Sequence, residues 1–404
     1  MTTTKREKRT TRMLAGGAVA VLAVAAFAAY MGTWGSEAHA GGRQARGFEA
    51  NANANDAAPA NPPRVDVVFA LDTTGSMAGL IDGAKRKVWA IANRVVSGQP
   101  RPDVRIGLVA YRDRGDEYIT RVVPLTRDID SVHEHLSGFQ ADGGGDGPEH
   151  VNQALADSIR KMQWDSGENV LKLIFLVGDA PPHDDYRDGM TAISLAKEAK
   201  QEGIVINAIR CGSDPYAETA WRAIASAASG RYASIAQDGG VVAVSTPFDE
   251  TLRGLNVELA SSMVGFGDGR RRARAARKSA ARAALPPAAA APAASYSAKA
   301  DRLDSDDLVT AWKEGSIDLG GLMAAELPDE IATLDAPRQE AWLKGKDKDR
   351  KRLNAKILKV AKKREAYLFE AEAEDGAGAD LGFDGQVLDM LREQAAEIGV
   401  KYAE

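Results

Sequence analysis

Residues 65–76 read VDVVFALDTTGS, a short apolar run rich in β-branched side chains that ends in a polar turn. Similar apolar runs recur at residues 104–111, 171–177 and 204–209. Strands that are apolar along their whole length are typical of a parallel sheet covered on both faces. The stretch at 65–76 therefore predicts a buried strand with Asp72, Thr74 and Ser76 at its carboxyl end.

Segments with helical periodicity separate these runs. They cover residues 80–96, 149–162, 190–201, 219–228 and 248–263, and the last of them is expected to close the domain. Strands that alternate with helices predict an α/β class fold, with a doubly wound, mostly parallel sheet and helices on both of its faces. Residues 117–125 alternate more strongly and follow closely after a strand, so they predict an antiparallel edge strand.

The first forty residues have the features of an export signal. Five basic residues precede an uncharged apolar run at 13–34, and Ala38-His39-Ala40 supplies the small residues that a signal peptidase requires. We expect cleavage after Ala40, and an uncleaved anchor is the alternative, because a run of about 20 apolar residues can cross a bilayer. In both cases the body of the protein is exported, either as a periplasmic or secreted protein or anchored in the cytoplasmic membrane and facing outward.

Composition divides the rest of the chain. Residues 41–63 are rich in Ala, Asn, Gly and Pro and predict a disordered linker before the α/β domain, which we place at 64–263. Residues 264–299 hold a cluster of arginines and then a run of Ala and Pro, which predicts a second linker. Residues 300–404 contain amphipathic stretches that predict a small helical C-terminal region.

Oxygen-bearing side chains follow the predicted strands at the sheet edge where ligands collect in doubly wound folds. They are Asp72, Thr74 and Ser76 after the first strand, Asp146 in the loop GGGDGPE at 143–149, and Asp179 after the strand at 171–177. Hydroxyl and carboxylate oxygens are hard ligands that suit Mg²⁺, Mn²⁺ or Ca²⁺. The sequence therefore predicts a divalent metal site at this edge.

The pattern Asp72-x-Thr74-x-Ser76 resembles the metal-ion-dependent adhesion site of von Willebrand factor A domains, in which Asp-x-Ser/Thr-x-Ser follows an apolar strand. The Gly-Asp-Ala-Pro-Pro turn that contains Asp179 also stands at the family's second acidic position. This resemblance covers about half of the chain. It implies that Thr74 and Ser76 bind the ion directly, while Asp72 and Asp179 act directly or through water. The chain departs from many members in the middle loop, where it has Asp146 in place of Thr.

The resemblance implies a divalent-metal-dependent protein-binding or adhesion module, and the export signal predicts that it is of exported bacterial type and extracytoplasmic. We expect that it is not an enzyme. A protein ligand would complete the coordination through an acidic side chain or a solvent molecule, although the added carboxylate of Asp146 should weaken the attraction for an acidic group. We expect Glu149, His183 and Asp184 at the rim of the site, with a solvated acidic loop at 183–185 as the alternative.

The sequence gives little support for phosphate binding, nucleic-acid binding or hydrolytic catalysis. The glycine-rich loop lacks the Lys-Ser/Thr that follows a phosphate cradle, and the net charge of −5 gives no broad positive field, so no nucleic-acid partner is expected. A membrane contact is expected only through the N-terminal segment, if it stays uncleaved. No nucleophile elbow or His-Glu-x-x-His stretch appears. The alternative function is a metal-dependent hydrolase, or an accessory subunit of a larger enzyme complex, that uses the same metal site.

Overall fold

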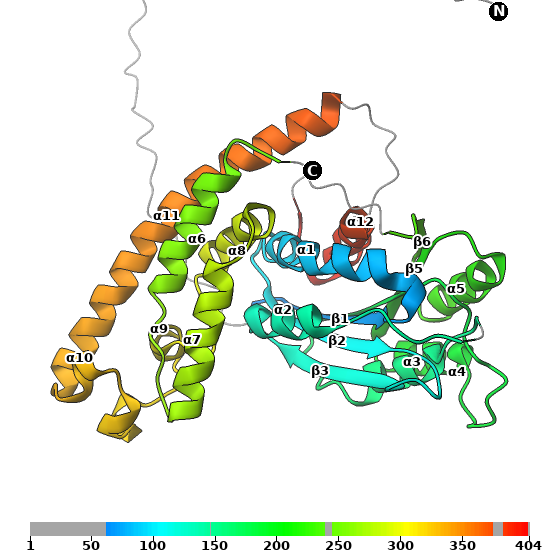
Figure 1. Cartoon of the computed structure of the whole chain (residues 1–404), viewed down its shortest axis with the longest axis horizontal. Helices are drawn as coiled ribbons and strands as arrows, with labels where there is room; N and C mark the ends of the chain where they lie inside the picture. The colour runs from blue at the N-terminus through cyan, green and yellow to red at the C-terminus, as the bar shows by residue number, and fades with distance from the viewer. Residues whose placement is uncertain (1–61, 146, 239–244, 375–382, 403–404) are drawn as a thin grey trace, which may run out of the picture. The chain divides into compact units, whose positions relative to one another are not determined.

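The computed structural model describes residues 62–145, 147–238, 245–374 and 383–402. Among these residues, six strands form one sheet in the order β3-β2-β1-β4-β5-β6 (Figure 1). The strands are β1 (Arg64–Asp72), β2 (Asp103–Tyr111), β3 (Thr120–Thr126), β4 (Val170–Gly178), β5 (Ile204–Cys211) and β6 (Tyr232–Ile235). The pairing of β2 with β3 is antiparallel, and the other pairs are parallel. The predicted doubly wound fold is confirmed.

Helices cover both faces of the sheet because successive side chains of a strand point to opposite faces. Val67 and Phe69 of β1 lie in one apolar cluster with α1, α2 and α12, whereas Val68 and Ala70 lie in another with α3, α4 and α5. The bounds of these helices are α1 (Ala78–Val95), α2 (Ile129–Gly138), α3 (Val151–Arg160), α4 (Ala192–Gln201), α5 (Pro215–Ala227) and α12 (Phe383–Ala395). Burial on both sides explains why the strands are apolar throughout.

A helical region follows β6 in the chain. Its helices are α6 (Asp249–Ser261), α7 (Gly269–Ala283), α8 (Pro287–Ala300), α9 (Leu308–Lys313), α10 (Asp329–Ala332) and α11 (Ala336–Glu374). Short 3-10 turns are η1 (Gly75–Met77), η2 (Leu319–Gly321), η3 (Ala324–Glu326) and η4 (Ala396–Ile398). Helix α8 packs against α1 on one side and against α6 and α11 on the other, so it joins the helical region to the α/β sheet (Figure 1).

The segment expected to be a second linker, residues 264–299, is helical and largely buried. Alanines of α8 such as Ala290 and Ala294 are fully buried, and the basic side chains of Lys278 and Arg282 in α7 point into the protein. The expectation of a linker is therefore wrong. Alanine is the strongest helix former and its small side chain permits close helix packing, so the same composition serves a buried helix as well as a spacer.

The helix that closes the sheet also differs from the expectation. Residues 248–263 were expected to do so, but α6 packs mainly against α7, α8 and α11. Instead α12, near the end of the chain, packs on α1, β4 and β5. Gln99 and Lys401 form a bridge, and the Tyr402 hydroxyl donates to the Val95 carbonyl at 2.9 Å. The helical region is thus inserted between β6 and the last helix of the α/β fold.

Several sequence predictions concern residues that the structure does not describe. The export signal, residues 41–61 of the linker expected at 41–63, and Asp146 lie outside the described residues. Within the described part of the chain, no helix combines the length and the apolar character needed to span a bilayer.

Candidate metal centre

The ends of β1 and β4 meet at the edge of the sheet where the sequence predicts the site. Leu71 pairs with Val177, so Asp72 and Asp179 leave their strands side by side. A Cβ added to Gly178 would lie 2.4 Å from the Tyr111 hydroxyl and 3.0 Å from Asp72 Oδ2. Glycine at this position is therefore required for the close approach of the two strand ends.

The turn after β1 is held by the side chain of Asp72. Its Oδ1 atom accepts hydrogen bonds from the Thr74 amide at 2.9 Å and from Thr74 Oγ1 at 2.6 Å. Thr74 Oγ1 lies 3.3 Å from Ser76 Oγ. The Thr74 side chain makes no capping hydrogen bond to the turn η1 that follows. The three oxygen-bearing side chains are therefore gathered on one turn without serving as a helix cap.

The glycine-rich middle loop brings Glu149 to the same place. The Glu149 amide donates to the Pro181 carbonyl at 3.0 Å, and the His183 amide donates to the Glu149 carbonyl at 3.1 Å, which ties this loop to the one after β4. A Cβ added to Gly144 would lie 3.0 Å from Glu149 Oε1 and 3.1 Å from Thr74 Cβ. Glu149 is buried beside the turn that carries Thr74, so it belongs to the centre of the site.

Burial and mutual repulsion disfavour the charged forms of these acids. Burial, together with the neighbouring Asp179 and Asp116, raises the pKa of Asp72 to about 7, although hydrogen bonds from Thr74 oppose the change. Burial and the nearby carboxylates, Asp72 foremost, raise the pKa of Glu149 to about 9. Near neutral pH Glu149 therefore holds a proton, and a bound cation would favour the ionised forms of both acids.

Two further aspartates at this edge were missed by the sequence reasoning. Asp116 accepts hydrogen bonds from the Gly144 amide at 3.1 Å and the Asp113 amide at 3.1 Å. The Tyr186 hydroxyl donates to the carboxylate of Asp113, whose two oxygens lie 2.7 and 2.9 Å from it. Both acids follow the carboxyl end of β2. Ligands collect beyond the carboxyl ends of the strands, and this rule predicts Asp113 and Asp116 when it is applied to β2 as well as to β1 and β4.

Two of the residues expected at the rim of the site, His183 and Asp184, have surroundings that differ from each other. His183 is buried, stacks on Tyr186 with ring centroids 4.2 Å apart, and has Nε2 3.7 Å from Asp113 Oδ2. Asp184 accepts from Asn152 Nδ2 at 3.1 Å and from the Ala192 amide at 3.3 Å, which fixes its loop to α3 and α4. His183 thus lies beside the acidic cluster, while Asp184 has a part in holding the loop.

The donor set suits a hard divalent cation. Asp72 Oδ2 and Glu149 Oε2 are buried and have no hydrogen-bond partner among the residues that the structure describes. Buried carboxylate oxygens without a partner are rare, because the desolvation cost is not offset. Hydroxyl and carboxylate oxygens are the ligands that Mg²⁺, Mn²⁺ and Ca²⁺ prefer. Asp72, Thr74, Ser76, Asp179 and Glu149 therefore fit such an ion.

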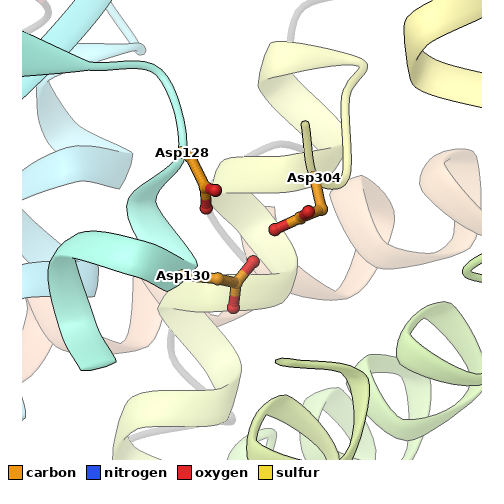
Figure 2. A group of neighbouring side chains, drawn as sticks. All are labelled: Asp128, Asp130 and Asp304. Carbon is orange, nitrogen blue, oxygen red and sulfur yellow. The ribbon is translucent and has the colours of Figure 1, made fainter. Parts of the chain in front are cut away.

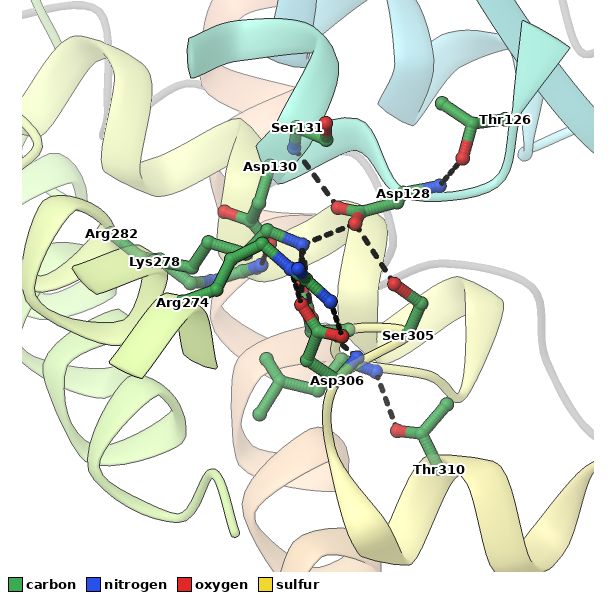
Figure 3. A network of polar contacts seen from close by, with 12 residues as sticks. Thr126, Asp128, Asp130, Ser131, Arg274, Lys278, Arg282, Ser305, Asp306 and Thr310 are labelled. Carbon is green, nitrogen blue, oxygen red and sulfur yellow. Dashed lines mark hydrogen bonds and ion pairs between the residues drawn. The ribbon is translucent and has the colours of Figure 1, made fainter. Parts of the chain in front are cut away.

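A second group of carboxylates lies between α2 and the helical region. Figure 2 shows Asp128, Asp130 and Asp304, whose oxygens approach within 4.8 Å of one another. Positive side chains already balance these acids: Lys278 pairs with Asp128 and, at 3.1 Å, with Asp304, and Arg282 pairs with Asp130 at 2.9 Å (Figure 3). The ammonium group of Lys278 thus stands where a cation would be needed, and the group has the chemistry of a buried ion-pair network.

The α/β part of the chain is similar to known proteins. Residues 66–247 match the sequence profile described as von Willebrand factor A domain. The von Willebrand factor A domain-containing protein 7 of Rattus norvegicus is 35% identical over 127 residues, which are 31% of this chain and 13% of that protein. The alpha-protein kinase vwkA of Dictyostelium discoideum is 29% identical over 121 residues, which are 30% of this chain and 19% of that protein. The match thus spans a fifth or less of these relatives.

Solved structures give distant matches. The BatB protein of Bacteroides thetaiotaomicron has a TM-score of 0.32 at 18% identity and covers 43% of this chain and 90% of its own. Proximal thread matrix protein 1 from the mussel byssus, in a structure described as having a zinc occupied MIDAS motif, has a TM-score of 0.35 at 16% identity and covers 44% of this chain and 43% of its own. The sequence match over residues 66–247 identifies this part of the chain as a von Willebrand factor A domain.

Proposed function

We propose that this protein is a divalent-cation-dependent protein-binding module that acts outside the cytoplasmic membrane. Domains of this family are generally involved in protein–protein interaction. The observation that carries the metal dependence is the pair of buried, unpartnered oxygens, Asp72 Oδ2 and Glu149 Oε2, beside the hydroxyls of Thr74 and Ser76. A bound Mg²⁺, Mn²⁺ or Ca²⁺ supplies a positive centre that an oxygen of the partner can join.

The side chains of the metal centre have different roles in binding the ion. Asp72 orients Thr74 through two hydrogen bonds, so that the Thr74 and Ser76 hydroxyls present their oxygens together. Glu149 and Asp179 supply negative charge from the two neighbouring loops, with Asp146 as a further donor. Because Asp113 and Asp116 add to this charge, an acidic group of the partner is attracted less strongly than at a site with fewer carboxylates.

We propose binding rather than catalysis for the same site. The thiol of Cys211 is fully buried, and burial raises its pKa well above the ordinary value, so a reactive thiolate is disfavoured at neutral pH. The two ring nitrogens of His150 lie within hydrogen-bonding distance of the Gln153 amide and of Arg114, and neither partner is a nucleophile. The extracytoplasmic location rests on the basic residues and apolar run of the N-terminal segment.

Calorimetric titration of Mg²⁺, Mn²⁺ and Ca²⁺ into the full chain tests the metal site. Saturable binding that is lost in Asp72→Ala, and kept in Asp349→Ala on the exposed surface of α11, is the expected result. No binding to the folded wild-type chain would refute the proposal. Metal-dependent turnover of ester or peptide substrates that Asp72→Ala abolishes would replace the binding module with the hydrolase alternative.

A further inference from the structure

Gln237, in the turn after β6, reaches across the sheet edge to the candidate metal centre. Its Nε2 atom donates to Asp179 Oδ2 at 2.7 Å and to the Ser76 carbonyl at 3.2 Å. The two amide hydrogens thus join the turn after β1 to the turn after β4. Neither the sequence motif nor the comparisons assign a role to this residue.

The fold makes room for this side chain at Gly212, directly after β5. A Cβ added to Gly212 would lie 2.2 Å from Gln237 Oε1, and the backbone there has φ of +72°. Any other residue at 212 would be strained and would also displace the Gln237 amide. The Gly212 amide donates to the Ile235 carbonyl at 3.0 Å, which fixes the end of β6 just before Gln237. The position of Gln237 is therefore determined by the turns after three strands.

We propose that Gln237 is a positioning residue of the metal centre, and this inference rests on the metal dependence proposed above. A neutral amide that donates to Asp179 fixes the direction of its carboxylate and leaves its negative charge intact for the ion. The second hydrogen bond holds the Ser76 backbone, so one side chain sets the spacing between a hydroxyl ligand and a carboxylate ligand. Loss of such outer hydrogen bonds weakens metal binding by about 10–100-fold.

The test compares two replacements of Gln237 in the full chain by titration with Mg²⁺ and Mn²⁺. Gln237→Ala removes the whole amide, and Gln237→Met keeps the length of the side chain without its donors. Both are expected to lower the affinity for Mg²⁺ by about tenfold. The matched control is Gln163→Ala, which should bind as the wild type does. Gln163 is exposed between α3 and β4, and its carbonyl accepts from Arg105 near the start of β2, at the other end of the strands from the site.

Gly212→Ala gives an independent variant that leaves every donor in place. It should weaken metal binding because it displaces the Gln237 side chain, and it should have no further effect when added to Gln237→Ala. Such non-additivity is the sign that two positions act through one another. A second readout is thermal unfolding with and without Mg²⁺: a merely structural role would lower the midpoint of the metal-free protein and leave the increment caused by metal unchanged.

The outcomes separate this inference from the proposed function. Wild-type binding with equal affinity in Gln237→Ala and Gln237→Met would overturn the role of Gln237 and leave the metal centre standing. A loss in Gln237→Ala that Gln237→Met restores would also overturn it, because packing rather than hydrogen bonding would then be the cause. Absence of binding in the wild type would refute the metal dependence and this inference with it.

Discussion

Asn207 in β5 and Gln394 in α12, which are 187 residues apart, exchange two hydrogen bonds in the core. Asn207 Nδ2 donates to Gln394 Oε1 at 2.9 Å, and Gln394 Nε2 donates to Asn207 Oδ1 at 2.8 Å. Asn207 Oδ1 also accepts from the Arg231 amide at 2.9 Å, directly before β6. A residue close to the end of the chain therefore completes the polar contacts of the central sheet.

Gln394→Leu is expected to destabilise the protein by about 1–3 kcal/mol, because it leaves the buried amide of Asn207 without its partner. Urea unfolding followed by tryptophan fluorescence measures this loss. The control is Glu393→Gln, which removes only the exposed pair with Arg231 and should cost less than about 0.5 kcal/mol. Equal effects of the two replacements would show that the Asn207–Gln394 pair does not tie α12 to the sheet.

This pair also shows where sequence reasoning reached its limit for the fold. The strands were predicted because burial on both faces demands unbroken apolar runs, as at residues 65–71. The closing helix was misplaced because α6 and α12 are both amphipathic, and periodicity shows that a helix has an apolar face without showing which surface covers it. Only a long-range contact such as Asn207–Gln394 decides between them.

For the site, residues that are close together in the sequence could be predicted from their spacing, whereas contacts between distant segments could not be predicted. Asp72, Thr74 and Ser76 follow one strand at fixed spacing, so a single turn gathers them. Gln237 carries no motif, and its contact with Asp179 depends on the order β1-β4-β5-β6 at the sheet edge. Residues that act through topology in this way cannot be found from spacing alone.

Glu149→Gln is expected to stabilise the metal-free protein and to weaken metal binding at least about tenfold. The pKa of Glu149 is about 9, above its ordinary value, so near neutral pH folding requires this group to take up a proton that the unfolded chain does not hold. Glutamine removes that requirement and also removes a negative donor. Thermal unfolding and metal titration check both effects, with the exposed Glu134→Gln as control. A variant that is less stable without metal would contradict the expectation.

Metal affinity should rise with pH between 6 and 8. With pKa values of about 7 for Asp72 and about 9 for Glu149, these groups hold protons that an incoming ion must displace. Each displaced proton adds up to about tenfold in affinity per pH unit. The free energy of unfolding of the metal-free protein should fall as the pH rises. The reason is that pKa values that are higher in the folded state than in the unfolded state favour folding at low pH.

Calorimetry in buffers with different ionisation enthalpies counts the protons released on metal binding. Glu149→Gln should show a shallower rise of affinity with pH than the wild type, because one titrating group is gone. An affinity that is independent of pH between 6 and 8 would mean that the carboxylates are already ionised, and that the two raised pKa values do not hold in solution.

Lys278→Met is expected to destabilise the protein by about 3–5 kcal/mol, because it leaves buried acids without their counter-charge. Lys278 pairs with Asp128, with Asp304 at 3.1 Å and with Asp306 at 3.2 Å (Figure 3). Burial alone would raise the pKa of Asp306, but Arg274 and Lys278 lower it to about 2. The matched control is Arg253→Met, which removes an exposed ion pair with Glu250 and should have little effect. If urea unfolding gave equally small losses for both, the network would not hold α7 against α2, and the helical region would depend on the apolar contacts of α8 alone.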